Sequence, residues 1–553
     1  MEKHYEIFAL AYHQCRWNYN DEEDVSTLQT NFDKYDIPVD AIWLDIEHTD
    51  GKRYFTWDLK KFPNPHEMIF NVSKKGRKMV TIIDPHIKKD ENYHVYKEAK
   101  ELGFFVKDHN GKSDYEGHCW PGGSMYLDFL NPMVREFWAS KFAFDQYVGS
   151  SENLFTWNDM NEPSVFSGPE VTMHKDAKHH GGWEHRDVHN IYSFYHHSST
   201  YNGLKKRSNG KVRPFVLTRS FFIGSQRTTA VWTGDNTATW DQLRITIPML
   251  LSLSISGIPL VGSDVGGFFN NPDEQLLVRW YQAAAFQPFF RSHAHIDTKR
   301  REPWLFSNET RNIIREAIRL QYGKPVMRPL FVEFPNDETS FDEEREFLIG
   351  SGLLVRPVME PDVSSVSLYL PGVRNVVWYD WTTHKAYPAP GAIYVNTPLD
   401  IIPLFQRGGT IIPIRRRIRR SSALMRQDPI TLYIASNYKD DFATGSLYLD
   451  DGESFEHLNG EFLYFSFIYK KEGDQLYSIS SQNLNGRGKM KNDVYIEKIV
   501  IRGVRYFPTR VHIFLDDWNP ESLDFDHDRD LQTLVIHRTN APVSAEFRID
   551  IHA

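Results

Sequence analysis

The sequence predicts an α/β protein: a (β/α)8 barrel, or TIM barrel, followed by two C-terminal antiparallel β-sandwich modules. Over the first 300 residues, short apolar runs alternate with stretches compatible with helices, which is typical of a parallel barrel. Beyond Gly323 the pattern changes to short alternating runs separated by turn signals, which favours antiparallel sheets. The length of 553 residues fits two to four domains at about 150 residues each.

Eight apolar runs are the predicted barrel strands, at residues 8–13, 39–45, 78–84, 153–159, 213–219, 229–235, 258–264 and 286–293. Two connections, residues 90–152 and 163–212, exceed an ordinary loop of such a barrel, so we expect long inserts after strands three and four. We therefore place the barrel at residues 1–324, a proximal β-sandwich at 325–414 and a distal β-sandwich at 415–553.

Charged side chains stand where these runs end. In a (β/α)8 barrel the carboxyl ends of the strands meet at one mouth, where such enzymes place their chemistry. A single aspartate after a strand usually caps the next helix, but five aspartates at eight strand ends exceed that expectation. The residues at the ends are His13, Asp45, Asp84, Asp159, Arg219, Asp235, Asp264, and Arg291 with His293.

Composition excludes several partners and cofactors. The formal net charge of −9 opposes binding to nucleic acid or to an anionic membrane surface. The uncharged run 245–263 is interrupted by Pro248, Gly257 and Pro259, which predicts a helix followed by a strand and no membrane insertion. Two cysteines match no spaced metal motif, and the His-rich stretch 174–197 lacks paired ligand spacing. We expect no catalytic metal and no cofactor.

Several carboxylates at one mouth and an aromatic content of 14% narrow the chemistry to sugar chemistry or carboxylate–metal chemistry, and only the former uses the aromatic rings. Glycoside hydrolysis needs two carboxyl groups that face the anomeric carbon, one to attack or activate water and one to protonate the leaving oxygen. The segments 157–163 and 232–236 each hold an aspartate beside an apolar wall, which Trp157, Met160 and Trp232 supply. Phe268 is a further candidate wall.

These two segments, together with 43–46, 262–267 and 290–293, resemble glycoside hydrolase family 31. The resemblance implies that Asp159 is the nucleophile and that Asp235 is the acid and base, with net retention of configuration. It also implies that the terminal glucose is held by a set of polar residues, Asp45, Asp84, Arg219, Asp264, Arg291 and His293. Glu162 is interpreted as a supporting group, because Pro163 follows it directly.

Within the family, segments 12–19, 46–50 and 157–166 are most similar to members that trim α-1,3-linked glucose from N-linked glycans in the endoplasmic reticulum lumen. Such members work with a non-catalytic β subunit, which the resemblance implies as a heterodimer partner here. Two alternatives stay open: a neutral cytosolic α-glucosidase acting on maltose or glycogen-derived oligosaccharides, and a catalytically silent carbohydrate-binding or assembly form.

The N-terminus differs from the family pattern. Family members carry a β-sandwich before the barrel, whereas here the first predicted strand begins within about ten residues of Met1, with no visible signal peptide. We therefore expect a chain that lacks this module, either as a fragment or as an alternative product.

Overall fold

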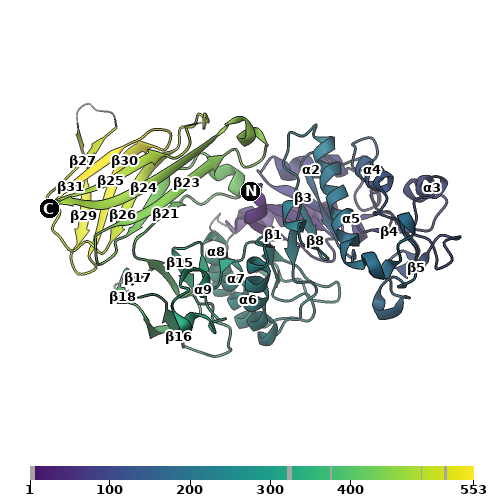
Figure 1. The fold of residues 1–553 in the computed structure, drawn as a ribbon, viewed down its shortest axis with the longest axis horizontal. Helices are drawn as coiled ribbons and strands as arrows, with labels where there is room; N and C mark the ends of the chain where they lie inside the picture. The colour runs from purple at the N-terminus through teal and green to yellow at the C-terminus, as the bar shows by residue number, and fades with distance from the viewer. Residues whose placement is uncertain (1–5, 321–326, 374–375, 487, 516–519) are drawn as a thin grey trace. The chain divides into compact units, whose positions relative to one another are not determined.

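The computed structural model describes residues 6–320, 327–373, 376–486, 488–515 and 520–553 (Figure 1). The chain forms two compact units. Unit 1 comprises Met1–Gln242 and Ser252–Gly323, and unit 2 comprises Leu243–Leu251 and Lys324–Ala553. The predicted boundary between residues 324 and 325 lies outside the described residues.

Unit 1 contains the predicted parallel barrel. Its strands run in the order β10-β9-β8-β7-β3-β2-β1-β12-β11, and every neighbouring pair is parallel. The strands are shorter than the predicted apolar runs, because several of these runs also include polar residues that lie beyond the strand at its carboxyl end. They are β1 (Tyr12–Gln14), β2 (Ala41–Leu44), β3 (Lys78–Ile82), β7 (Leu154–Asn158), β8 (Val216–Thr218), β9 (Ala230–Trp232), β10 (Val261–Gly262), β11 (Asp264–Val265) and β12 (Phe290–Ser292).

The ring closes through a split strand. β10 pairs with β9 and β11 pairs with β12, so the predicted seventh strand is divided at Ser263. The backbone N–H of Ser263 donates instead to Oε1 of Gln287 at 3.1 Å, which explains the interruption. Nine short strands therefore occupy eight barrel positions.

The first predicted run, residues 8–13, is only partly a strand. It begins as the 3-10 helix η1 (Ile7–Leu10), and β1 starts at Tyr12. The side chain of Phe8 is buried, and its ring lies 4.9 Å from Phe155 and 5.3 Å from Phe215. Packing Phe8 into this aromatic cluster requires a turn that an extended chain would not make, so tertiary contacts decide this segment.

Helices of unit 1 follow the strands (Figure 1). The insert after β3 also carries a small antiparallel sheet of β4 (His86–Lys88), β5 (Glu116–Cys119) and β6 (Gly122–Tyr126). Helix α5 lies within the second insert. The α-helices that lie wholly in this unit are α1 (Glu22–Lys34), α2 (Pro65–Ser73), α3 (His94–Glu101), α4 (Pro132–Ser140), α5 (His185–Arg207), α7 (Glu274–Ala284) and α8 (Asn308–Arg319), and its later 3-10 turns are η2 (Ile46–His48), η3 (Pro169–Val171), η4 (His180–Gly182), η5 (Ser225–Arg227) and η6 (Pro303–Leu305).

The uncharged run 245–263 gives a helix followed by a strand, as predicted, but Pro248 does not break it. Helix α6 (Trp240–Ile255) contains Pro248 and ends before Gly257, whose φ of +87° is a conformation that favours glycine. None of the helices in the described ranges is both long enough and apolar enough to cross a bilayer.

Unit 2 begins with a small antiparallel sandwich. A six-stranded sheet has the order β13-β14-β15-β20-β17-β18, and β16 pairs with β19 in a separate two-stranded sheet. Leu354 and Phe405 of the first sheet share one apolar cluster with Leu368 and Leu370 of the second, so the two sheets pack face to face. The elements are β13 (Met327–Arg328), α9 (Leu330–Glu333), η7 (Glu338–Ser340), β14 (Phe347–Ile349), β15 (Leu353–Val355), β16 (Ser365–Leu370), β17 (Val377–Asp380), β18 (Ala386–Pro388), β19 (Gly391–Asn396) and β20 (Leu404–Arg407).

The remaining strands form one eleven-stranded sheet in the order β28-β27-β31-β25-β24-β23-β21-β22-β26-β30-β29. Strands from both ends of this order contribute to one apolar cluster, for example Ile551 of β31 and Ile536 of β30, so the sheet folds over itself. The elements are β21 (Thr410–Arg415), η8 (Ser422–Met425), β22 (Ile430–Ala435), β23 (Ala443–Asp450), η9 (Glu456–Asn459), β24 (Phe462–Gly473), β25 (Leu476–Asn483), β26 (Tyr495–Arg502), β27 (Arg510–Phe514), β28 (Glu521–Ser522), β29 (Phe525–Asp528), β30 (Thr533–Pro542) and β31 (Arg548–His552).

This sheet is not purely antiparallel, which corrects the prediction. β22 and β26 pair in parallel along their whole length, and β21 meets β23 in parallel at Thr410. Parallel neighbours need a long crossover connection, which β23, β24 and β25 provide between β22 and β26. Alternation along a strand reports which face is buried but not the direction of its neighbour, so the sequence pattern alone did not reveal this pairing.

Candidate active site

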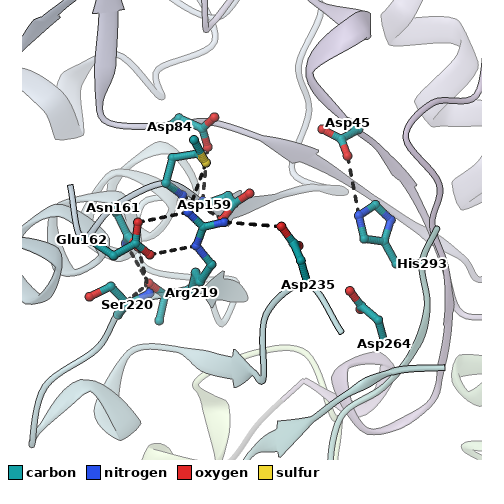
Figure 2. Close-up of polar contacts among 12 residues, drawn as sticks. Asp45, Asp84, Asp159, Asn161, Glu162, Arg219, Ser220, Asp235, Asp264 and His293 are labelled. Atoms are coloured by element: carbon teal, nitrogen blue, oxygen red, sulfur yellow. Dashed lines mark hydrogen bonds and ion pairs between the residues drawn. The ribbon is translucent and has the colours of Figure 1, made fainter. Parts of the chain in front are cut away.

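The barrel brings the predicted charged residues together at the carboxyl ends of its strands (Figure 2). Asp45, Asp159 and Arg219 directly follow β2, β7 and β8. Asp84 and Asp235 lie in the loops after β3 and β9, whereas Asp264, Arg291 and His293 come from β11, β12 and the residue after β12. His13 lies apart from this group: it is buried within β1 and accepts a hydrogen bond from Nε1 of Trp43 at 3.0 Å.

Arg219 connects the two central carboxylates. Its Nη1 lies 3.0 Å from Oδ1 of Asp159 and 3.9 Å from Oδ2 of Asp235. Figure 2 shows the guanidinium between Glu162 on one side and these two aspartates on the other. Because both aspartates approach the same nitrogen atom, their carboxyl groups are held close together.

Glu162 fixes the orientation of Arg219. Oε1 of Glu162 accepts from Nε at 2.8 Å and Oε2 accepts from Nη2 at 3.0 Å, which is a two-point contact. The loop that carries Glu162 is itself held, because Asn161 donates to Oγ1 of Thr218 at 2.8 Å and accepts from the N–H of Ser220 at 3.0 Å. Sequence reasoning treated Glu162 only as a supporting group, and its partner depends on β7 and β8 lying side by side.

Both central aspartates are harder to ionise than in water. Burial raises the pKa of Asp159 to about 7 against the opposing effect of Arg219, and Asp235 and Glu162 raise it further. Burial also raises the pKa of Asp235 to about 6, again opposed by Arg219 and supported by Asp264. These values do not separate the two groups into anion and acid. Arg219 lies closer to Asp159 than to Asp235, and this cation favours the charged form of Asp159.

The two aspartates also differ in how much of each side chain is exposed to solvent. The side chain of Asp159 is 12% exposed and that of Asp235 is 37% exposed. Asp159 also accepts the backbone N–H of Met160 at 2.8 Å, so its carboxylate is anchored, and no hydrogen bond with comparable geometry holds Asp235 among the described residues. Asp159 is therefore the deeper and better fixed of the two.

Asp264 and Arg291 form a buried ion pair in which one polar atom of each side chain stays without a hydrogen bond. Nε and Nη2 of Arg291 both donate to the same oxygen, Oδ1 of Asp264, at 3.0 and 2.8 Å. Oδ2 of Asp264 and Nη1 of Arg291 have no hydrogen-bond partner among the described residues. Buried polar atoms are normally paired, so an unpaired acceptor beside an unpaired donor indicates a place for a hydroxylated ligand. Burial raises the pKa of Asp264 to about 6, although Arg291 lowers it.

Asp45 and His293 form a second polar pair. Nε2 of His293 lies 3.6 Å from Oδ2 of Asp45, which is too long for a direct hydrogen bond. Burial lowers the pKa of His293 well below its usual value, and Arg291 adds to this effect, so the ring is neutral. The ring of Phe268 stacks on His293 at 4.9 Å, and Nδ1 of His293 has no partner in the part of the chain that the structure describes.

The predicted apolar walls lie beneath these polar groups. The rings of Trp157 and Trp232 contact each other edge to face at 5.5 Å, and the guanidinium of Arg291 lies 4.6 and 5.2 Å from their centroids. Both tryptophans are about 2% exposed, so they support Arg291 by cation–π contact more than they line an open surface. Met160 is also buried, with Sδ 3.1 Å from Nη2 of Arg219.

Sequence reasoning missed a chain of aromatic rings. Trp17 contacts His295 at 4.9 Å and Trp120 at 5.2 Å, and Trp120 contacts Phe166 at 4.9 Å. Trp120 and Phe166 are 38% and 39% exposed, so these rings offer flat apolar surface to solvent. The exposed Trp-Pro-Gly-Gly turn after Cys119 was the available signal, but its neighbours come from distant loops.

Asp84 lies behind Asp159. Oδ1 of Asp84 accepts the backbone N–H of Asp159 at 3.2 Å, and Oδ2 accepts from the hydroxyl of Tyr54. Burial raises the pKa of Asp84, and the charge of Asp159 adds to the increase.

Within the described ranges, no group of three or more His, Cys, Asp or Glu side chains is arranged to hold a metal ion.

Comparison with known proteins identifies this arrangement. Residues 4–323 match the glycosyl hydrolases family 31 TIM-barrel domain, and residues 323–412 match the glycosyl hydrolase family 31 C-terminal domain. The chain is 50% identical over 566 residues to neutral alpha-glucosidase AB of Dictyostelium discoideum, covering 99% of this chain and 59% of that protein.

Two solved structures are also similar. One is the ER glucosidase II heterodimeric complex of the catalytic subunit and the binding domain of the regulatory subunit, with TM-score 0.94 and 42% identity. The other is the glucosidase II alpha subunit with Glc1Man2 bound, with TM-score 0.94 and 41% identity. Each match covers 100% of this chain and 62% of the other.

The chain thus spans about three fifths of the length of the relatives that it matches. The match to the barrel domain nevertheless covers more than half of its residues, and the fold and the predicted motifs agree with it. This chain belongs to glycoside hydrolase family 31.

Proposed function

We propose that this chain is a retaining exo-α-glucosidase that removes terminal α-1,3-linked glucose from N-linked glycans. The observation that carries the proposal is the position of Asp159 and Asp235 on one nitrogen of Arg219, with the unpaired polar atoms of Asp264, Arg291 and His293 beside them. Retaining enzymes need two carboxyl groups about 5–5.5 Å apart, one to attack and one to donate a proton. The shared contact with Arg219 supports such a spacing.

In the first step, the Asp159 carboxylate attacks the anomeric carbon and the bond to the leaving oxygen breaks. Asp235 gives its proton to that oxygen, so a β-glucosyl ester forms at Asp159. In the second step, Asp235 takes a proton from water, which attacks the same carbon and releases Asp159. Two inversions give net retention. The cation of Arg219 stabilises the Asp159 carboxylate before the attack and again when it leaves.

Glucose selection is assigned to four residues. Asp45, Asp264, Arg291 and His293 orient the hydroxyl groups of the terminal glucose, and charge-assisted hydrogen bonds of this kind fix geometry strongly. The unpaired buried atoms of the last three support this assignment. The exposed rings of Trp120 and Phe166, with the partly buried ring of Trp17 beside Trp120, support binding of the sugar units beyond the cleaved bond, because sugar faces pack on aromatic rings.

Hydrolysis of p-nitrophenyl α-glucoside by the purified chain tests the reaction, with proton NMR of the first product to establish the anomer. We expect α-glucose first, and β-glucose would exclude a retaining mechanism. No product from a chain that still unfolds cooperatively would favour the silent binding form.

A second experiment tests the substrate. Glucose release from a diglucosylated high-mannose glycan is compared with release from maltotetraose. Preference for maltotetraose would favour the neutral α-glucosidase alternative.

Partner and location are part of the same proposal. The similar structure that contains a regulatory subunit domain supports a non-catalytic β subunit as partner, and its origin supports the endoplasmic reticulum lumen as location. Co-expression of the chain with a β subunit, followed by size-exclusion chromatography, is expected to give a complex. Separate elution of the two chains would contradict this part of the proposal.

The Glu162 contact with Arg219 gives a separate prediction. Glu162→Gln is expected to lower kcat/KM by about 10- to 100-fold, because a charge-assisted hydrogen bond contributes about 1.5–3 kcal/mol. The measurement is the kcat/KM of the two proteins on the same α-glucoside. Glu170→Gln is the matched control, since Glu170 lies nearby in the sequence, in η3, but makes an exposed ion pair with Lys175 at 3.4 Å. Equal losses in both variants would show that Glu162 does not act through Arg219.

A further inference from the structure

Asp84 differs from Asp264, which is also fully buried in the site, in how its carboxylate oxygens are used. Asp84 and Asp264 both have fully buried side chains. Oδ2 of Asp264 has no hydrogen-bond partner among the described residues, whereas both oxygens of Asp84 accept hydrogen bonds from the protein. The resemblance to family 31 implies that Asp84 holds glucose, but its hydrogen bonds direct it toward the backbone of Asp159.

Behind Asp84 the hydrogen bonds continue to two further buried residues. The hydroxyl of Tyr54 donates to Oδ2 of Asp84, and the same hydroxyl oxygen lies 2.9 Å from Nε2 of His86. All three side chains come from different segments: Tyr54 from the loop after η2, Asp84 from the loop after β3, and His86 from β4. Each of the three residues is 0% exposed, so water does not compete for these contacts.

The single proton of the Tyr54 hydroxyl determines which atom donates in each of these hydrogen bonds. Because that proton is donated to Asp84, the Tyr54 oxygen must accept from His86, which places the ring proton of His86 on Nε2. Nδ1 of His86 then carries only a lone pair, consistent with its lack of a partner within the described residues. Burial lowers the pKa of His86 to about 3, so the neutral ring persists at neutral pH.

This series of hydrogen bonds ends at the backbone N–H of Asp159, the nucleophile. Oδ1 of Asp84 accepts the N–H of Asp159 at 3.2 Å, and the next N–H, that of Met160, donates to the Asp159 carboxylate at 2.8 Å. Near the same point, Asn158 donates to the carbonyl of Ile83 at 2.7 Å. A shift of Asp84 would therefore move the backbone on which the Asp159 carboxylate is mounted, and a misplacement of about 1 Å can reduce a rate 100-fold.

We propose that Tyr54 and His86 are positioning residues, which hold Asp84 so that it fixes the backbone of Asp159 in place for attack. This role deepens the proposed glucosidase mechanism and rests on it. In this proposal Asp84 holds the backbone of the nucleophile Asp159 and does not bind the hydroxyl groups of glucose.

Tyr54→Phe tests the proposal, because it removes only the hydroxyl. We expect kcat on p-nitrophenyl α-glucoside to fall about 10- to 100-fold, in line with the cost of leaving a buried acceptor without its donor, while KM changes less than about threefold. The affinity for a non-hydrolysable thio-linked α-glucoside is expected to stay within the same factor. Tyr192→Phe is the matched control, since Tyr192 is equally buried and its hydroxyl donates to the carbonyl of Leu127 at 2.9 Å.

His86 provides a second pair of variants. His86→Leu removes the donor to Tyr54 and is expected to lower kcat, whereas His86→Gln keeps an N–H group and is expected to recover part of that loss. Equal activities of the two variants would show that His86 only fills space. A rise in KM together with weaker thio-glucoside binding in Tyr54→Phe would show that Asp84 contacts the sugar, which overturns the proposal.

Amide hydrogen exchange at residues 154–162 supplies a readout that does not depend on glucosidase activity. Exchange at the Asp159 amide is expected to increase at least about fivefold in Tyr54→Phe, because a hydrogen bond contributes about 1 kcal/mol to protection, and to stay unchanged in Tyr192→Phe. If the parent chain does not hydrolyse glucosides, the proposed function fails, and exchange alone decides the positioning role. Unchanged exchange in Tyr54→Phe would overturn that role whatever the activity.

Discussion

Replacing Asp159 with alanine is expected to lower kcat on p-nitrophenyl α-glucoside by a factor on the order of 10⁴ or more, the scale on which loss of a nucleophile acts. Without this carboxylate no β-glucosyl ester forms, and Arg219 keeps its contacts with Glu162 and Asp235. Steady-state kinetics of the parent and Asp159→Ala at equal concentration make the measurement. Substantial turnover by a homogeneous variant would refute the assignment.

Azide distinguishes the nucleophile from the acid and base. In Asp159→Ala, azide enters the space of the missing carboxylate and displaces p-nitrophenolate directly from the anomeric carbon, so β-glucosyl azide is expected. In Asp235→Ala, azide attacks the glucosyl ester in place of activated water, so α-glucosyl azide is expected. The anomer, determined by NMR, assigns the two roles without reference to the pKa values. The opposite pair of products would exchange them.

A second variant, Asp159→Asn, gives a control for folding. The pKa of Asp159 in the folded chain, about 7, is raised above its ordinary value of 3.8. The contribution of such a carboxyl group to the free energy of unfolding is fully present below pH 3.8 and is lost as the pH rises through about 7. Asparagine does not titrate, so the variant is expected to melt at a higher temperature than the parent at pH 8 and with little difference near pH 3.5. A lower melting temperature at pH 8 would show that the carboxylate stabilises the fold.

Replacing Asp235 with alanine is the second large effect, and its size is expected to depend on the leaving group. General acid catalysis contributes about 10²–10⁴-fold, and a sugar leaving group needs that proton more than p-nitrophenolate does. The loss of kcat/KM on a glucosyl oligosaccharide is therefore expected to exceed the loss on p-nitrophenyl α-glucoside by at least about tenfold. Release of p-nitrophenol should show a burst, because the second step lacks its base. Equal losses on both substrates would argue against Asp235 as the acid.

The pH profile supplies a further test of Asp235. The first step needs the protonated carboxyl group of Asp235, whose pKa is raised to about 6, together with the ionised carboxylate of Asp159, whose pKa is raised to about 7. The kcat/KM of the parent should therefore pass through a maximum between about pH 6 and pH 7 and fall as the pH rises further. This alkaline limb should be absent in Asp235→Ala. If the limb persists in the variant, another group titrates there.

Most of the strand-end residues could be predicted from the sequence, because barrel strands are short apolar runs and the polar residue that closes a run enters the mouth. Asp45, Asp159 and Arg219 illustrate this, since each stands directly after its strand. His13 illustrates the limit: its run bends into a 3-10 turn, so the strand extends past His13 and the ring stays inside the barrel. A local pattern does not show where a strand begins when packing of Phe8 decides it.

The sequence by itself determined the parallel barrel and the two β-rich parts that follow it, because hydrophobic period and strand-end chemistry are local properties of the chain, and its motifs carried the resemblance to the family. Only the tertiary structure decided the contacts between strands. The clamp of Glu162 on Arg219, the split of the seventh strand at Ser263 and the path from His86 through Tyr54 to Asp84 all join segments distant in sequence. Hydrogen bonds depend on distance and angle at the ångström scale, and these are set by how the segments pack.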